Sequence, residues 1–154
     1  MVKTEPSLKA RAMRLLARRE HSRAELARKL AAHAAESDDV AALLDELSAK
    51  GWLSDARFAE QSIRAKSRRF GPLKVAHYLR SKGVDDDVIT AGTRAAGSDG
   101  IAAIAAIWRS RFRAGPADDR EKARQVRFLQ GRGFPLDAVL RFLQNPHFKP
   151  GDAS

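Results

Sequence analysis

The sequence predicts an all-α fold in which three tandem three-helix motifs form an elongated, curved array. Alanine, leucine, arginine, lysine and glutamate are abundant, and only 6% of residues are aromatic. These abundant residues lose little side-chain freedom in a helix. Apolar residues recur at three- and four-residue intervals along most of the chain. The pattern itself recurs about every fifty residues, which indicates stacked units that are each too small to be stable alone.

The first motif is expected over residues 10–53. Ser22 and Glu25 have the spacing of a capping box, in which each side chain bonds the other residue's backbone N–H, so a second helix begins there. Ser37-Asp38-Asp39 caps a third helix, which Gly51 ends. The apolar faces of the three helices are Ala12, Leu15 and Leu16, then Leu26 and Leu30, then Val40, Leu43, Leu44 and Leu47.

The second motif is expected over residues 54–98. Asp55 begins a helix that runs to about Arg69. Gly71-Pro72 separates this helix from the next, because proline is tolerated in a first turn. Asp85-Asp86-Asp87 supplies the cap and the first-turn carboxylates of a short third helix. The apolar faces are Phe58, Ala59 and Ile63, then Val75, Tyr78 and Leu79, then Val88 and Ile89.

The third motif is expected over residues 99–145, followed by a loose tail over 146–154. Gly115-Pro116 marks a loop, and Asp118-Asp119-Arg120-Glu121 is another capping box. Pro135 lies in the first turn of the last helix. The apolar faces are Ile101, Ile104, Ala105 and Trp108, then Val126, Phe128 and Leu129, then Val139, Leu140 and Leu143.

Equivalent positions support the repeat. Leu30, Leu79 and Leu129 lie 49 and 50 residues apart, each late in the second helix of its motif. Lys82-Gly83-Val84 and Arg132-Gly133-Phe134 occupy matching turns. The valines of the third helices follow the same spacing: Val40, Val88 and Val139.

The chain is strongly basic. Its 29 lysines and arginines exceed its 19 aspartates and glutamates, giving a formal net charge of +10. Residues 1–53, 54–98 and 99–154 carry about +2, +4 and +4, so the excess is concentrated in the second and third segments. Such a surplus favours nucleic acid, an acidic protein or a membrane surface as partner, although a basic surface also serves solubility alone.

Residues with catalytic or metal-binding spacing are not found. The chain has no cysteine, and His21, His33, His77 and His147 do not pair at the spacing of metal ligands. The carboxylates cluster at helix starts, where capping explains them. No phosphate-binding loop or nucleophile elbow is present. The sequence therefore predicts a protein that is not an enzyme and has no catalytic residue, metal or cofactor.

The cellular location follows from what the sequence lacks. No signal-peptide pattern is present, and no apolar segment is long enough to span a bilayer. We therefore expect a cytoplasmic protein with no membrane partner, and we expect it to be a monomer.

Arginine placement indicates a binding surface. Arg57, Arg64 and Arg68 fall within about 40° on one helix face, opposite Ala59, Ile63 and Phe70. A second row recurs at i, i+4 and i+7 in the third motif, although a single row is often only a solvated face. The planar guanidinium suits phosphates and carboxylates. The candidate partner or DNA contacts are Arg57, Arg64, Arg68, Arg69, Lys74, Arg80, Lys82, Arg120, Arg124, Arg127 and Arg132.

The two tryptophans offer a further route to nucleic acid. Trp52 and Trp108 have flat rings on which bases can stack. The core-packing interpretation is favoured for both, because large aromatic side chains mostly serve the core.

Three ordered motifs resemble those of the RecX family of regulatory proteins over about residues 10–145. The matching segments are Arg19–Leu26 with Lys29-Leu30 in the first motif, Asp55–Ala59, Arg68–Pro72 and Leu79–Val84 in the second, and Lys122–Leu129 with Arg132–Phe134 in the third. The chain departs from the family in its alanine-rich segments Ala31–Glu36 and Ile101–Ala106.

This resemblance implies three tandem three-helix motifs and a role as a modulator of the RecA recombinase. It implies binding of the RecA filament on single- or double-stranded DNA, within the helical groove. It also implies inhibition of ATP hydrolysis, strand exchange and the coprotease activity of the SOS response. The nucleotide would belong to the partner, so no cofactor is expected here.

Two other functions fit the residues. Three-helix motifs with basic faces also describe a stand-alone DNA-binding protein of helix-turn-helix type. An adaptor for an acidic protein would show the same charge pattern. Affinity for naked DNA compared with RecA-coated DNA separates the first of these from a filament modulator.

Overall fold

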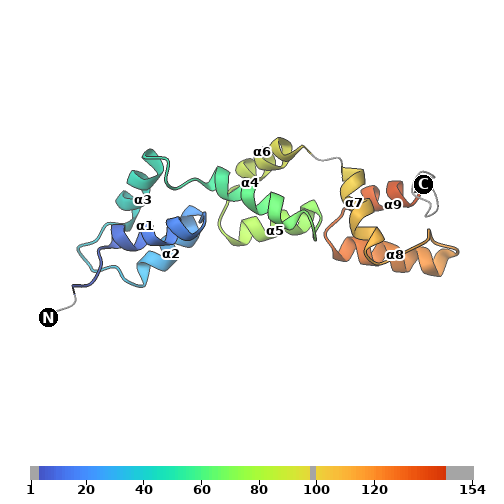
Figure 1. The fold of residues 1–154 in the computed structure, drawn as a ribbon, viewed down its shortest axis with the longest axis horizontal. Coiled ribbons are helices and arrows are strands. Elements are labelled where there is room, and N and C mark those ends of the chain that lie inside the picture. The colour runs from blue at the N-terminus through green and yellow to red at the C-terminus, as the bar shows by residue number, and fades with distance from the viewer. Residues whose placement is uncertain (1–3, 98–99, 145–154) are drawn as a thin grey trace. The chain divides into compact units, whose positions relative to one another are not determined.

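The structure, a computed structural model, describes residues 4–97 and 100–144. Within them the chain forms nine α-helices and no strand, which confirms the all-helical class (Figure 1). No helix in this part of the chain is long and apolar enough to cross a membrane. The helices are α1 (Leu8–Arg18), α2 (Arg23–Ala31), α3 (Val40–Ala49), α4 (Asp55–Lys66), α5 (Pro72–Ser81), α6 (Asp86–Ala96), α7 (Gly100–Arg109), α8 (Asp119–Gly131) and α9 (Leu136–Gln144).

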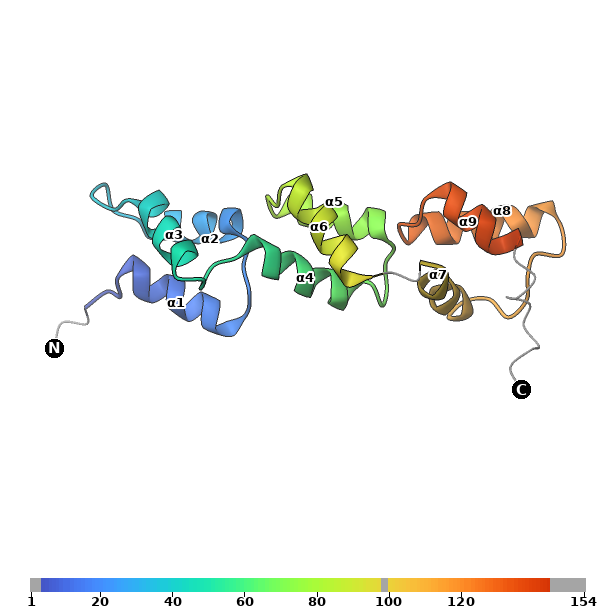
Figure 2. The same cartoon turned by 90° about the horizontal axis from the view of Figure 1, so that it is seen from above.

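Helices α1, α2 and α3 gather around one apolar core (Figures 1 and 2). The expected caps are present: Ser22 Oγ accepts from the Glu25 N–H, and Asp39 accepts from the Ala42 N–H. Burying a leucine side chain stabilises a fold by about 1.5–3 kcal/mol, so the apolar faces hold these short helices together. The buried core residues are Ala12, Leu26, Leu30, Leu44, Leu47 and Leu53.

Helices α7, α8 and α9 surround a second core, in which Trp108 is 3% exposed (Figures 1 and 2). The core-packing prediction for this tryptophan is therefore confirmed. Its Nε1–H donates to Gln125 Oε1 at 2.9 Å, and Gln125 Nε2 donates to the Ala114 carbonyl at 3.0 Å. Gln125 is fully buried, and its side-chain amide is hydrogen-bonded to the Trp108 indole and to a backbone carbonyl. The equivalent positions in the other two motifs are the apolar residues Leu26 and Val75.

The three anchor leucines, Leu30, Leu79 and Leu129, are each 0% exposed. Gly83 and Gly133, in the matching turns, have φ of 77° and 101°, a left-handed backbone that glycine adopts without a Cβ clash. In each turn the next residue's N–H returns to the carbonyl of the anchor leucine. The repeat inferred from spacing is thus a repeat of local structure.

Contacts divide the chain into two compact units. The first unit contains residues 4–61 and 79–92, and the second contains 62–78, 93–97 and 100–144. The division passes through the middle motif, so α4 and α5 each contribute residues to both units. The three motifs therefore describe the repeat in sequence, whereas the two units describe packing. The tail expected over 146–154 lies outside the described residues.

Helix α4 is shorter than predicted, since it ends at Lys66 and not near Arg69. The Arg69 N–H donates to the carbonyl of Lys66, three residues earlier, which is the pattern of a 3₁₀ turn and not of an α-helix. The chain then leaves the helix so that the Gly71 N–H can donate to the Arg132 carbonyl at 2.7 Å. Consequently Arg68 lies beyond the helix, and the predicted three-arginine row on one helix face is wrong at that position.

Two apolar side chains predicted to pack inward are exposed. Trp52 is 42% exposed, with Lys50 Nζ 5.0 Å from its ring centroid, so its core-packing prediction is wrong. This tryptophan follows Gly51, whose positive φ ends the turn after α3. Ile101 is 49% exposed, because it lies in the first turn of α7, ahead of the residues that enter the core.

Candidate basic binding surface

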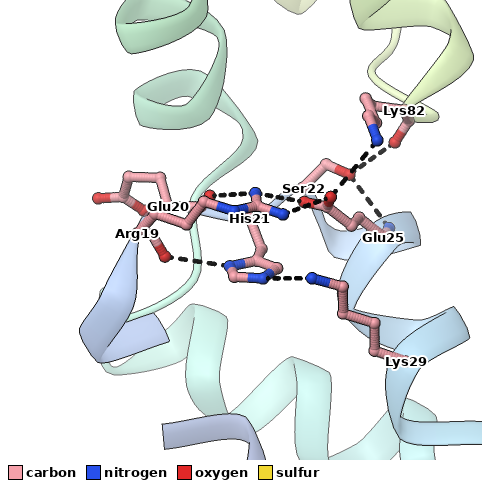
Figure 3. A network of polar contacts seen from close by, with 7 residues as sticks. All are labelled: Arg19, Glu20, His21, Ser22, Glu25, Lys29 and Lys82. Atoms are coloured by element: carbon pink, nitrogen blue, oxygen red, sulfur yellow. Dashed lines mark hydrogen bonds and ion pairs between the residues drawn. The ribbon is translucent and has the colours of Figure 1, made fainter. Parts of the chain in front are cut away.

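A polar junction in the first compact unit joins the turn after α5 to the start of α2 (Figure 3). Ser22 Oγ donates to the Lys82 carbonyl at 2.6 Å while it caps α2. Gly83 lies against the side chain of Ala24, leaving no room for a Cβ at this glycine. The sequence therefore needs a small residue on each side of the junction.

Glu25 is the buried charge of this junction, with a side chain 6% exposed (Figure 3). Its two oxygens accept from Arg19 Nη1 and Nη2 at 3.0 and 2.9 Å, and Lys82 Nζ lies 3.5 Å away. The Arg19 hydrogen bonds lower the pKa of Glu25 to about 2, against the opposing effect of burial. The capping-box prediction is half correct: Ser22 caps the helix, but the Glu25 carboxylate binds cations.

His21 is 1% exposed and bonded through both ring nitrogens (Figure 3). Nδ1 lies 3.0 Å from the Arg19 carbonyl, and Nε2 lies 3.0 Å from Lys29 Nζ. A carbonyl only accepts and an ammonium only donates, so the ring is neutral with its proton on Nδ1. Burial lowers the pKa of His21, and the nearby charges of Arg19 and Lys29 lower it further.

This arrangement predicts acid sensitivity in the first compact unit. Because the pKa of His21 is lower when folded, the unfolded chain takes up the proton first, and stability falls as pH drops below about 6.5. An imidazole NMR titration should show His21 protonating below the ordinary histidine value of about 6.5. Protonation of His21 at or above that value would contradict the buried, neutral assignment.

The three candidate cations of the first unit are each paired with a carboxylate. Arg57 Nε donates to Glu20 at 2.8 Å, Arg80 Nε donates to Asp86 at 2.7 Å, and Lys82 Nζ faces Glu25 at 3.5 Å. These pairs link residues that are 37, 6 and 57 positions apart in the sequence. An alanine at Arg57 or Lys82 would therefore disturb the fold as well as any binding.

The second compact unit has an equivalent junction with different chemistry. Here the turn after α8 meets the start of α5: the Gly71 N–H donates to the Arg132 carbonyl, and the Leu73 N–H donates to the Gly133 carbonyl at 3.0 Å. Lys74 Nζ donates to the Gly131 carbonyl at 3.1 Å. The cations of this junction bind backbone carbonyls, which leave their positive charge uncancelled.

The structure brings Arg69, Lys74 and Arg132 together at this junction. Arg132 Nη1 donates to the Arg69 carbonyl at 3.4 Å, and its guanidinium lies 5.3 Å from the ring centroid of Phe128. Arg68 follows α4 directly and is exposed. The second-unit basic surface is defined as the eight candidate residues of this unit: Arg64, Arg68, Arg69, Lys74, Arg120, Arg124, Arg127 and Arg132.

The cations of the second-unit basic surface are not paired with carboxylates of the described residues. Among the described residues, none of its eight cations forms a salt bridge, whereas all three candidates of the first unit do. Arg120, Arg124 and Arg127 lie on α8 as predicted and are exposed, with the Arg124 guanidinium 5.6 Å from the Phe112 ring centroid. Charges in this state are available to an anionic partner.

Sequence reasoning missed the carboxylates that pair with the candidate cations of the first unit and so distinguish them from those of the second unit. Glu25 was assigned to capping alone and Asp86 to the first turn of a helix, and Glu20 was not singled out. A local signal existed for Glu25 and Asp86, whose arginine partners lie six residues away, but not for Glu20, whose partner lies 37 residues away. The described residues contain no group of three or more histidines, aspartates or glutamates placed to hold a metal ion.

The fold and the second-unit basic surface define a helical-repeat protein with an exposed basic face. The chain matches the family models for the first, second and third three-helix domains of RecX over residues 9–47, 54–92 and 98–143. It belongs to the RecX family of regulatory proteins, as its sequence motifs indicated.

Relatives and solved structures agree. The chain is 47% identical to the regulatory protein RecX of Chromobacterium violaceum, covering 89% of each chain, and 46% identical to that of Leptothrix cholodnii, covering 90% of this chain and 88% of that one. Its fold is similar to the crystal structure of RecX from Lactobacillus salivarius, with a TM-score of 0.77 at 17% identity over 89% of this chain and 92% of that one.

Proposed function

We propose that this protein binds the RecA–DNA filament in its helical groove as a monomer and inhibits it. Inhibition would restrain ATP hydrolysis, strand exchange and the coprotease activity of the SOS response. Family membership supports the regulatory role. The observation that carries the binding mode is the second-unit basic surface, whose eight cations have no carboxylate partner among the described residues.

The physical argument concerns the state of each cation before binding. A nucleoprotein filament presents phosphates, and neutralising them releases condensed counterions. An arginine already paired to a carboxylate must lose that partner before it binds a phosphate, whereas an unpaired one exchanges only water. The second unit is therefore better suited to the filament than the first, although the chain is basic in both.

The direct test is the DNA-dependent ATPase rate of RecA with this protein added at less than equal molar ratio. The rate should fall progressively with added protein. An unchanged rate, with the protein shown to be folded by circular dichroism, would contradict the proposal.

Removing charge from the second-unit basic surface should weaken filament binding. The side chains of Arg68, Arg120 and Arg127 are exposed and make no hydrogen bond or ion pair with described residues, so alanine at all three should leave the fold intact. We expect at least tenfold weaker binding. The slope of log affinity against log salt should also fall by about 0.7–0.9 for each lost phosphate contact. Fluorescence anisotropy with labelled RecA-coated DNA at several salt concentrations measures both.

The matched control removes the same charge from the first unit. The side chains of Arg14, Arg18 and Arg28 are also exposed and make no hydrogen bond or ion pair with described residues. Their triple alanine variant should bind the filament within about twofold of the parent. Salt screens exposed charges that lie farther from the partner than about 10 Å, so charges outside the contact surface contribute little. An equal loss in both triple variants would show that net charge, and not the second-unit basic surface, governs binding.

The free arginines also fit a phosphate backbone without RecA, so a stand-alone DNA-binding protein is the second candidate. The same anisotropy assay separates the two functions. A filament modulator should prefer RecA-coated DNA, whereas equal affinity for naked DNA with a steep salt slope favours the second candidate.

A further inference from the structure

The second compact unit contains an apolar cleft of about 800 Å³ that the basic surface does not explain. This volume lies in the range of ligand-binding sites, about 300–1,000 Å³. Helices α4, α5, α6, α7 and α9 contribute to it. Its buried walls include Ile63, Val75, Ile104, Phe134 and Phe142, each at most 6% exposed.

Ile101 gives the cleft an unusual rim. It lines the cleft yet is 49% exposed, one of four large apolar side chains exposed among the described residues. An exposed apolar side chain next to an apolar hollow is typical of a surface that a partner covers.

Two arginines also line the cleft, and no described carboxylate does. The side chain of Arg64, on α4, makes no hydrogen bond or ion pair with described residues. Arg141 of α9 contacts Asp137 at 3.2 Å, with the two side chains 76% and 77% exposed. Such an exposed pair is weak and exchanges readily. Both guanidinium groups are therefore available to a carboxylate on an incoming ligand.

We propose that this cleft binds an acidic peptide segment of a protein partner, with bulky apolar side chains inserted between the helices and flanking carboxylates on Arg64 and Arg141. A nucleic-acid backbone would satisfy the arginines but leave the apolar walls empty, and an apolar small molecule would leave the arginines unused. An acidic, apolar segment matches both features. The identification of the partner as RecA rests on the proposed function.

Ala96 and Ala95 provide a matched pair of variants to test the cleft. Both are exposed at the end of α6, but only Ala96 lines the cleft. Tryptophan at Ala96 should fill the cleft, whereas tryptophan at Ala95 should leave it open. Circular dichroism on each variant checks that helicity is retained.

The probe is a fluorescent six-residue peptide with a central leucine–phenylalanine pair flanked by aspartates and glutamates. Its two comparison peptides carry amides in place of the carboxylates, or an alanine pair in place of the apolar residues. The parent protein should bind the probe at least tenfold more tightly than either comparison peptide. The A96W variant should lose at least tenfold in affinity and A95W less than twofold. No binding by the parent, equal binding of all three peptides, or full binding by A96W would overturn the proposal.

Charge reversal gives an independent readout. Arg64→Glu should lower the affinity for the acidic probe at least tenfold and leave the affinity for the amide peptide unchanged. Arg14→Glu, which makes the same charge change on α1, outside both the cleft and the second-unit basic surface, should change the affinity for the acidic probe less than twofold. Equal effects of the two reversals would overturn the role of Arg64.

The RecA ATPase assay separates this inference from the proposed function. Inhibition by the parent with no peptide binding would overturn the cleft and leave the modulator role standing. Peptide binding without inhibition of the RecA ATPase would support the cleft and overturn the modulator role. Loss of both peptide binding and inhibition in A96W, with A95W intact, is the result expected if the cleft holds the partner.

Discussion

Replacing Gly133 with alanine should destabilise the second compact unit by about 2–5 kcal/mol. Gly133 has φ of 101°, and a left-handed backbone costs an L-residue about 1–2 kcal/mol. A Cβ there would also lie 2.5 Å from Lys74 Cβ and 2.8 Å from the Lys74 backbone nitrogen. Backbone cannot move aside cheaply, and overpacking adds about 1–3 kcal/mol. Urea unfolding followed by circular dichroism measures the loss.

Two further alanine variants separate strain from overlap. Gly131→Ala, at the end of α8, would meet nothing within 4 Å and should be neutral or slightly stabilising. Gly71→Ala has no positive φ, but its Cβ would lie 2.6 Å from the Gly133 carbonyl carbon. It should therefore lose stability through overlap alone. Equal stability of all three variants would mean that the two turns do not pack as described.

Replacing Glu25 with glutamine should cost about 2 kcal/mol of stability at pH 7. Glutamine keeps the shape but leaves Arg19 and Lys82 without their shared buried carboxylate. Removing one partner of a fully buried pair costs about 3–5 kcal/mol. The loss here is smaller because the Arg19 side chain is 49% exposed and can rehydrate. Chemical unfolding of the parent and of the variant gives the difference.

The pH dependence of stability tests the same interaction. The pKa of Glu25 is lowered from 4.5 to about 2 in the folded protein, so its contribution is complete above about pH 4.5 and is lost as pH falls toward 2. Glu25→Gln should flatten that part of the stability curve. Glu46 also has its pKa lowered to about 2, by Lys9 and Lys50, but it is solvent-exposed. Glu46→Gln should have a much smaller effect on stability at pH 7. Comparable losses in the two variants would contradict a buried role for Glu25.

The two junctions show one local geometry with two arrangements of charge. Glu25 and Lys74 each lie five residues before the anchor leucine of their motif, and each faces a matching glycine turn. In the first unit, the Glu25 carboxylate forms ion pairs with Arg19 and Lys82, so these cations stabilise the junction. At Lys74 a lysine replaces it, so the second junction is held by backbone hydrogen bonds and its cations stay available. Repeated geometry with a change of charge thus separates a structural junction from a candidate binding surface.

The sequence by itself determined the helices, their repeat and the family. Helix periodicity, capping and turn glycines are local properties, fixed by residues three to five positions apart. Ser22, Gly83 and Gly133 could therefore be placed correctly from their immediate neighbours. The three-motif order was visible for the same reason, because each motif repeats the same local signals.

Only the tertiary structure decided which cations are available. Arg57 and Lys82 meet carboxylates that lie 37 and 57 positions away, and no local pattern reveals a partner at that separation. The end of α4 at Lys66 is set by the hydrogen bond that Gly71 makes to Arg132. The apolar cleft likewise exists only where helices from different motifs pack. Charge and periodicity can be counted along a chain, but pairing and packing depend on which distant residues the fold brings into contact.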